Sequence, residues 1–377
     1  MILMKRASRI ISFIMIICFS SSLTSCFNYR DINRATFVTS IIYDIDENKN
    51  TILYLDCVMP YRSTNESSEK GRRVIYKGRG KTVLEAIRNA SNFSSFKINM
   101  TQCRAYIFSE RAAKEGVGQF VDIMARDQEF LIRPYVFVLF GEVEELFKTV
   151  KSDEEYLGIY LDQLVYKMKS SPRTIAANLN DYLTNRINGG NIAVLGGLEV
   201  VKDIMEDRVQ IKGAAVLKDD KLATKLSIDE ALSYSFLSNN VKSGTLEINN
   251  PQNPDKYITL EILNSKTNTD VKYDGERIKL YKTIDIRCDL AESQARLIID
   301  DNVRGYIKKS EEENVKKYLT MIFDRYKLQD LDLFKVGRLL EEKYPDAKIQ
   351  GEIMERTDLI LNVNVNLEGP SVRKHTF

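Results

Sequence analysis

The sequence is poor in the residues that most catalytic and metal sites need. It has no tryptophan, five cysteines and one histidine, His375, close to the C-terminus. Nucleophilic triads need a positioned imidazole, and the usual zinc sites need His and Cys sets at fixed spacing. The glycines at Gly78-x-Gly80 and Gly196-Gly197 lack the rest of any phosphate-binding fingerprint. We therefore expect no enzyme activity, no catalytic residue, no metal and no cofactor.

An excess of charge of one sign is also missing. The chain has 55 Lys and Arg residues against 53 Asp and Glu residues. A nucleic-acid-binding protein usually presents a basic face, so this balance argues against a nucleic-acid partner. The hydrophobic share of 44% and the charged share of 29% are those of a folded globular protein. Beyond the N-terminal segment no apolar run approaches the length of a membrane-spanning helix.

The N-terminal segment has the order of a secretory signal. The basic residues Lys5, Arg6 and Arg9 precede the apolar run 10–19, which is too short to span a bilayer of roughly 30 Å. Small residues and then Leu23-Thr24-Ser25-Cys26 follow. This box resembles the lipobox of bacterial lipoproteins. The resemblance predicts cleavage between Ser25 and Cys26 and a diacylglycerol (palmitate-type) anchor on Cys26; an ordinary signal peptide with a chance cysteine is the alternative.

A lipid on Cys26 would fix where the mature chain works. Each buried CH₂ contributes about 0.8 kcal/mol, and one acyl chain alone binds a membrane only marginally, whereas two hold a protein stably. Removal of residues 1–25 would leave 352 residues with 52 basic and 53 acidic side chains. We expect a folded protein held on a membrane surface without a spanning segment.

The remaining cysteines give no pattern of a metal or redox site. Cys57, Cys103 and Cys288 each lie in an apolar, strand-like run, and an odd number cannot all pair within the chain. We expect three buried thiols, with a Cys57–Cys103 disulfide as the alternative.

The first half of the mature chain alternates strands with helices. Strand-like runs lie at 37–44, 51–59, 74–76, 103–108 and 134–140, and helical spacing of apolar residues occurs around 83–90, 120–126, 156–168 and 175–183. This alternation predicts an α/β layer arrangement. Asn188-Gly-Gly-Asn191 is the best candidate for a domain boundary.

The second half is richer in strands. Strands are predicted at 192–201, 209–217, 244–249, 257–265, 276–287 and 359–367, and helices at 228–238, 292–325 and 331–343. Ser227-Ile-Asp-Glu230 is a capping box at the start of the first of these helices. We predict a mixed α/β (α+β) fold of several small domains in an extended arrangement, each a β-sheet packed with helices. The expected division is a signal peptide at 1–25 and domains at 26–190, 191–242 and 243–377.

Carboxylate groups are the main candidates for chemistry. Asp219-Asp220, Asp300-Asp301 and Glu311-Glu-Glu313 lie in predicted turns or on a helix surface, where we expect solvated charge. Arg126-Asp127-x-Glu129 stands before the strand at 134–140. The favoured interpretation is a local Arg–carboxylate pair at a helix-to-strand corner, and a ligand site is the alternative.

The ordered motifs resemble those of one family, the Ger(x)C spore germination lipoproteins. The resemblance extends from Cys26 to about Gly369 and departs at Phe27, where the family usually has tryptophan. It is carried by these segments: Cys26-Phe-Asn-Tyr-Arg-Asp-Ile32, Arg126-Asp-x-Glu129, the run 213–230 that begins Gly-Ala-Ala-Val-Leu-Lys, the segment 329–337 with Lys343-Tyr-Pro345, and the closing strand 361–369.

The resemblance implies a non-enzymatic C subunit of a nutrient germinant receptor. Such subunits are anchored by lipid on the outer face of the spore inner membrane and act with membrane-embedded A-type and B-type subunits. It implies structural or interface roles for Arg30, Asp31, Arg126, Asp127 and Glu129. Two other functions stay open from the residues alone: a lipoprotein that binds a small solute for a transporter, and a carboxylate-based hydrolase outside the cytoplasm.

Overall fold

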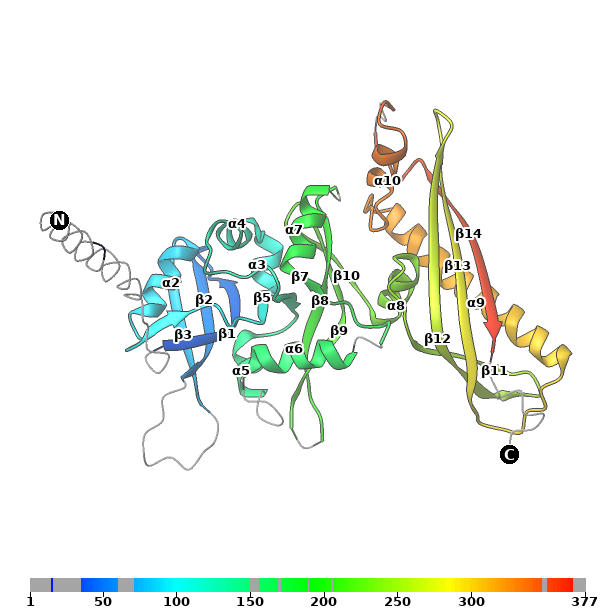
Figure 1. The fold of residues 1–377 in the computed structure, drawn as a ribbon, viewed down its shortest axis with the longest axis horizontal. Helices are drawn as coiled ribbons and strands as arrows, with labels where there is room; N and C mark the ends of the chain where they lie inside the picture. The colour runs from blue at the N-terminus through cyan, green and yellow to red at the C-terminus, as the bar shows by residue number, and fades with distance from the viewer. Residues whose placement is uncertain are drawn as a thin grey trace, which may run out of the picture.

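The computed structural model describes Met15 and residues 35–59, 71–149, 156–168, 171–188, 190–204, 206–347 and 351–368. In this part the chain forms two β-sheets packed with helices, which follow one another along the long axis of the molecule (Figure 1). The architecture is mixed α+β and extended, which confirms the predicted fold class.

The first sheet is parallel in the middle and antiparallel at both ends. Its strands follow the order β10-β9-β8-β6-β5-β1-β2-β3, with β4 beside β1 and β7 beside β6. The pairs β1–β5, β5–β6 and β6–β8 are parallel. The bounds are β1 Ala35–Ile45, β2 Thr51–Met59, β3 Arg72–Gly80, β4 Lys97–Asn99, β5 Ala105–Ser109, β6 Tyr135–Leu139, β7 Ala177–Asn178, β8 Ile192–Val201, β9 Arg208–Lys218 and β10 Lys221–Leu226.

Helices cover both faces of this sheet. Successive side chains of a strand point to opposite faces, and in β6 Val136 and Val138 enter one core whereas Phe137 and Leu139 enter the other. The first core includes residues of α2 (Val83–Ser91), α3 (Glu110–Glu115), α4 (Gly118–Arg126) and α7 (Leu179–Asn188); the second includes residues of α5 (Val143–Thr149) and α6 (Leu157–Met168). A strand buried on both sides explains the continuous apolar run of β6.

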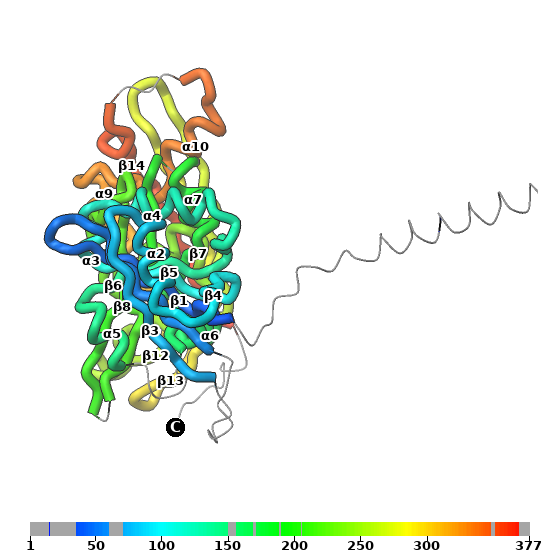
Figure 2. Tube along the Cα trace, turned by 90° about the vertical axis from the view of Figure 1, so that its left-hand side faces the viewer, coloured from blue at the N-terminus to red at the C-terminus, as the bar shows by residue number. Residues whose placement is uncertain are grey.

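The second sheet carries its helices differently. Its order is β11 (Gly244–Asn250), β12 (Asn253–Tyr273), β13 (Ile278–Ser293) and β14 (Thr357–Leu367), with β14 parallel to β13. The long helix α9 (Asp301–Lys327) packs against β14, and α10 (Val336–Lys343) against β12. Figure 2 shows α10 and the turn between β12 and β13 at the same end of the molecule.

Helix α8 (Ile228–Leu237) joins the two units. One core contains Val194 and Val216 of the first sheet, Phe236 of α8 and Ile284 of the second sheet. The first sheet continues past residue 190, because Gly196 of β8 pairs with Phe137 of β6. The division into 26–190, 191–242 and 243–377 stays a prediction about which parts fold independently.

Several helices and strands begin or end at other residues than the sequence predicts, because strands pair with segments far away in the chain. The helix expected from residue 292 begins at Asp301, because Ser293 still pairs with Ile258 and Asp300 caps the helix by accepting from the Val303 N–H at 2.7 Å. The helix expected at 175–183 begins at Leu179 after the bridge to β6, and the one expected at 331–343 begins at Val336. The strands expected at 257–265 and 276–287 extend to Tyr273 and Ser293.

The predicted local signals were confirmed where the structure describes them. In the capping box, Ser227 Oγ accepts from the Glu230 N–H at 3.3 Å and Glu230 Oε2 accepts from the Ser227 N–H at 2.8 Å. Gly78 lies within β3 beneath α2, where an added Cβ would come within 2.0 Å of the Ala86 carbonyl oxygen. This glycine therefore permits close strand–helix contact and does not mark a loop. The sequence Ser152-Asp-Glu-Glu155 also predicts a capping box, and it lies outside the described residues.

Candidate functional site

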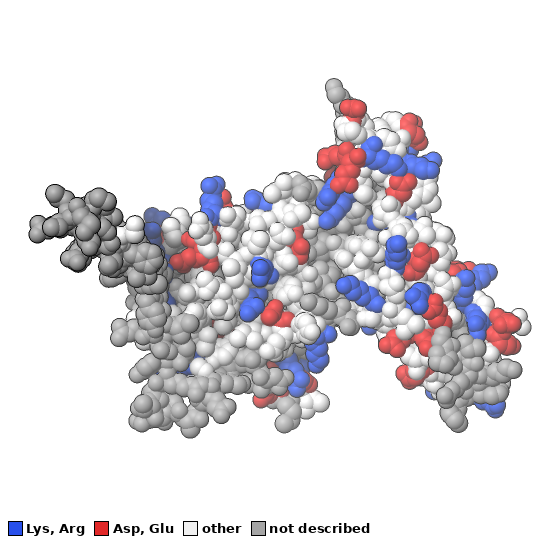
Figure 3. Space-filling model, viewed as in Figure 1, with Lys and Arg blue, Asp and Glu red and all other residues white. Residues whose placement is uncertain are grey.

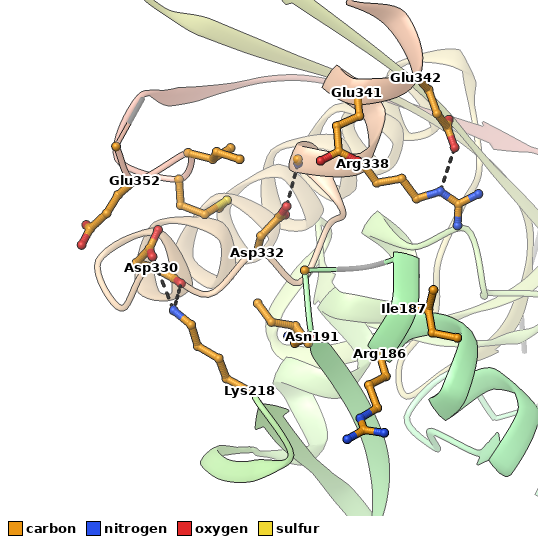
Figure 4. Close-up of a pocket in the computed structure, with 16 residues that line it drawn as sticks. Arg186, Ile187, Asn191, Lys218, Asp330, Asp332, Arg338, Glu341, Glu342 and Glu352 are labelled. Carbon is orange, nitrogen blue, oxygen red and sulfur yellow. Dashed lines mark hydrogen bonds and ion pairs between the residues drawn. The ribbon is translucent and has the colours of Figure 1, made fainter. Parts of the chain in front are cut away.

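A wide cleft lies between the two units. Its volume is about 770 Å³, and α7, β8 and β9 contribute one wall while the α10 region contributes the other (Figure 4). The charged lining residues are Arg186, Lys218, Asp330, Asp332, Arg338, Glu341, Glu342 and Glu352. A solute-binding protein would be expected to hold its ligand in such a cleft with convergent polar groups.

Most of these charged groups already have partners within the chain. Lys218 Nζ donates to the Asp330 carbonyl at 3.0 Å, and Arg338 Nε lies 2.7 Å from Glu342 Oε1 (Figure 4). Arg186 reaches Asp220 Oδ2 at 2.6 Å. Beside the cleft, Lys335 Nζ donates to Asn185 Oδ1 at 2.8 Å. Of these contacts, Lys218–Asp330 and Lys335–Asn185 join the two units, and the other two lie within one unit.

One half-buried aspartate of the cleft, Asp332, binds the backbone. Asp332 accepts from the Val336 and Gly337 N–H groups at 2.8 Å each, which satisfies two donors at the start of α10. Burial raises the pKa of Asp332, and these two N–H groups partly counter the effect. Lys335, just before the helix, adopts the left-handed backbone conformation with φ 58°. The arrangement is a helix cap and does not form an acid–base pair.

The predicted cluster at the end of α4 does not converge on one point. Arg126 Nε lies 2.8 Å from Asp122 Oδ1 on the same helix, Asp127 Oδ1 accepts from the Glu129 N–H at 2.9 Å, and Glu129 pairs with Lys97 at 3.1 Å. All these ion pairs are exposed. The three residues shape the corner before β6 through separate partners, and an interface role for them stays a prediction.

The acidic clusters found in the sequence differ in their structural environment: some lie in turns or caps, and one contains a buried side chain. Asp219 and Asp220 form the left-handed turn between β9 and β10, where Asp220 also accepts from the Tyr182 hydroxyl at 2.6 Å. Asp300 is the cap of α9. Glu311 differs from the expectation of solvated charge, because its side chain is only 3% exposed. The sequence held a signal for this: Glu311 stands four residues from both Ile307 and Val315, in the apolar period of the helix.

The three described cysteines are buried free thiols. Burial raises the pKa of Cys103 and of Cys288 to about 12 and raises that of Cys57 further. Thiolates, the reactive form, are therefore strongly disfavoured at these positions. The structure has no Cys57–Cys103 disulfide, the alternative left open by the sequence.

Other site classes find little support in the described part of the chain. No group of three or more His, Cys, Asp and Glu side chains there could hold a metal ion. On the face in Figure 3, basic and acidic side chains are intermingled and form no broad patch of one sign. None of the described helices is long and apolar enough to span a membrane. Ser25, Cys26, Arg30 and Asp31 lie outside the described residues, so their roles stay predictions.

The fold defines a class of protein built from two helix-packed sheets that share a core between them. Family comparison gives a sharper result. The family model described as "Spore germination protein N-terminal domain" matches residues 28–200, and the one described as "Spore germination B3/ GerAC like, C-terminal" matches residues 212–370. The chain therefore belongs to the Ger(x)C family of spore germination proteins.

Individual relatives agree with this assignment. Spore germination protein B3 of Bacillus subtilis (strain 168) is 21% identical over 387 aligned residues, which cover 97% of this chain and 98% of the relative. Spore germination protein GerQC of Bacillus cereus is 22% identical over 288 residues, 75% of this chain and 79% of the relative. The crystal structure of the GerBC protein has the same fold, with a TM-score of 0.58 and 14% identity over 91% of this chain and all (100%) of that one.

Proposed function

We propose that this chain is the lipid-anchored, non-enzymatic C subunit of a nutrient germinant receptor, needed for the germination response of spores. The observation that carries the proposal is the match of both family models, in order, over residues 28–200 and 212–370. The cleft between the units supports it indirectly, because most of its charged groups already have partners within the chain.

The proposed attachment is a diacylglycerol anchor on Cys26 after removal of residues 1–25. The supporting observations are the Leu23-Thr24-Ser25-Cys26 box and the charged and apolar order of the preceding segment. The domains would lie on the outer face of the spore inner membrane beside membrane-embedded A-type and B-type subunits. Anchoring raises the local concentration of the domains near those partners, which strengthens weak contacts without any new interaction.

Replacement of the anchor residue tests this function. We expect Cys26→Ala to move the protein from the membrane fraction to the soluble fraction or leave it unprocessed, and to slow germination toward specific nutrients. Cys18→Ala, which changes a cysteine inside the signal segment, is the matched control and should behave like the wild type. Spores that lack the gene and its paralogues yet germinate normally toward every nutrient would contradict the proposal.

The alternative of a solute-binding lipoprotein makes a different prediction for the large cleft. Arg186→Ala and Glu341→Ala both alter its lining and would weaken uptake of the solute. For a receptor subunit we expect no such transport defect in the same strains, and the germination assay distinguishes the two functions directly.

A further inference from the structure

Glu311 has one carboxyl oxygen without a partner. The residue lies on the sheet-facing side of α9, 3% exposed. Its Oε2 atom is buried and makes no hydrogen bond to any described residue. Buried polar atoms in folded proteins are almost always hydrogen-bonded, because the loss of water is otherwise uncompensated. An unpaired carboxyl oxygen at this position needs an explanation.

The same side chain lines a cavity of about 430 Å³ between α8, β11 and α9. The cavity shares no lining residue with the large cleft between the units. Its apolar walls are formed by Leu232, Phe236, Leu246, Ile248, Val315 and Leu319. A ligand there would have an apolar body in contact with these walls and one polar group that reaches Glu311.

The electrostatics of the cavity favour a cation. Three carboxyl residues line it, Asp229, Glu247 and Glu311, against one basic residue, Arg173, whose guanidinium already lies 3.4 Å from Glu247 Oε2. Tyr257 and Tyr318 also line it and are 50% and 57% exposed. Tyrosine ring faces attract organic cations.

We propose that this cavity is a binding site for a small organic ammonium ion, whose N–H group donates to Glu311 Oε2 while its apolar part packs against the walls from α8 and α9. An anion would meet an excess of carboxyl groups. A bare divalent metal ion would require several converging oxygen ligands, whereas no group of three or more His, Cys, Asp and Glu side chains in the described part of the chain could hold one.

Protonation of Glu311 should be coupled to this binding. Burial raises the pKa of Glu311 to about 7; a hydrogen bond with Asn314 lowers it and the nearby Glu247 raises it. The other charged groups that face the cavity are Asp229 from α8 and Arg173 from the segment after α6. Cys288 of β13 is also near, and its own pKa is raised by burial and by Glu311. A bound cation favours the ionised carboxylate, so binding near pH 7 should release a proton.

Calorimetric titration of the full chain in detergent with 2-phenylethylammonium tests the site. We expect binding at pH 8, a loss of affinity of ~10- to 100-fold in Glu311→Gln, and no change in Glu313→Gln, an exposed neighbour on the same helix. The neutral analogue 2-phenylethanol should bind much more weakly than the ammonium ion.

A second measurement uses the wild-type chain alone. In the wild-type chain the affinity for 2-phenylethylammonium should fall more than about 10-fold between pH 8 and pH 5.5, because Glu311 takes up a proton that competes with the ligand. The ligand itself stays charged over this range, as a lysine side chain does. Absence of binding, equal binding of the alcohol, a flat pH profile or unchanged affinity in a folded Glu311→Gln variant would each overturn the proposal.

Discussion

Each unit of the molecule buries a carboxyl group, and the two environments differ. Asp56 of the first sheet is fully buried and accepts from Arg73 Nε at 2.6 Å, the Leu157 N–H at 2.8 Å and Thr39 Oγ1 at 3.1 Å. Glu311 of the second unit is almost as buried, yet its Oε2 has no partner among the described residues and lines a cavity.

The difference separates a structural carboxylate from a candidate binding group. Asp56 ties the start of α6 to the strands beneath it, because it joins the Leu157 N–H to β1 and β3. A buried carboxylate whose oxygens all accept hydrogen bonds holds the surrounding elements in place. A buried carboxylate with an unpaired oxygen lowers stability unless a ligand or a proton binds to that oxygen. Substitutions at the two positions should therefore have opposite effects.

The largest effect is expected at Asp56. Asp56→Ala leaves the buried Leu157 N–H without its acceptor and removes the ionic partner of Arg73, so the free energy of unfolding should fall by about 3–5 kcal/mol. Urea unfolding measures this loss.

Asp56→Asn keeps the size of the side chain and should lose part of the same stability, because an amide retains one acceptor oxygen. A loss below about 1 kcal/mol for Asp56→Ala would show that the three contacts do not hold α6, and would remove the contrast with Glu311.

A smaller effect of opposite sign is expected at Glu311. Its folded-state pKa of about 7 lies above the ordinary value of 4.5. Folding therefore favours the protonated form of Glu311. The stability that this protonated carboxyl contributes is fully present below pH 4.5 and is lost as the pH rises to 7. Glu311→Gln should be more stable than the wild type at pH 8 by up to about 3 kcal/mol.

The two proteins should become equal in stability near pH 4.5, and thermal unfolding from pH 4.5 to 8 measures their difference. Asp56 and Asp332 also have pKa values raised by burial, and both are present in each protein, so their contributions cancel in this comparison. A difference that does not change with pH would contradict the burial of an ionisable Glu311.

The smallest effect is expected for the contacts between the units. The side chains of Lys218 and Asp330 are 37% and 34% exposed, and their ionic distance is 3.4 Å. Lys218→Ala should lower stability by about 0.2–1 kcal/mol in urea unfolding, because α8 and the shared core still join the units. A loss of several kcal/mol would show that the charged contacts, and not the apolar core, hold the units together.

The sequence predicted the elements whose local pattern agrees with their final environment. The continuous apolar run 134–140 became the central strand β6, and the alternation of Leu361, Val363 and Val365 became the buried side of β14. Ser227 caps α8, as the capping box predicted. These signals are local, so one sequence is enough to find them.

Distant pairing and side-chain burial could not be found in the same way. Residues 266–270, Lys-Thr-Asn-Thr-Asp, are typical of a loop, yet they pair with β13 and only Thr267 among them is buried. Glu311 was interpreted as solvated because charge on a helix usually is. Its spacing from Ile307 and Val315 places it on the apolar side of α9, but the extent of its burial depends on where β11 and α8 pack, which that spacing does not specify.

The central claim is that this chain acts beside membrane-embedded receptor subunits. The most direct test is cross-linking of intact spores followed by purification of the tagged chain from their membranes and identification of what accompanies it. We predict that two membrane-embedded proteins, an A-type and a B-type subunit, are recovered with the wild type and with Cys18→Ala, and are lost with Cys26→Ala. Recovery of the anchored chain alone would contradict the account.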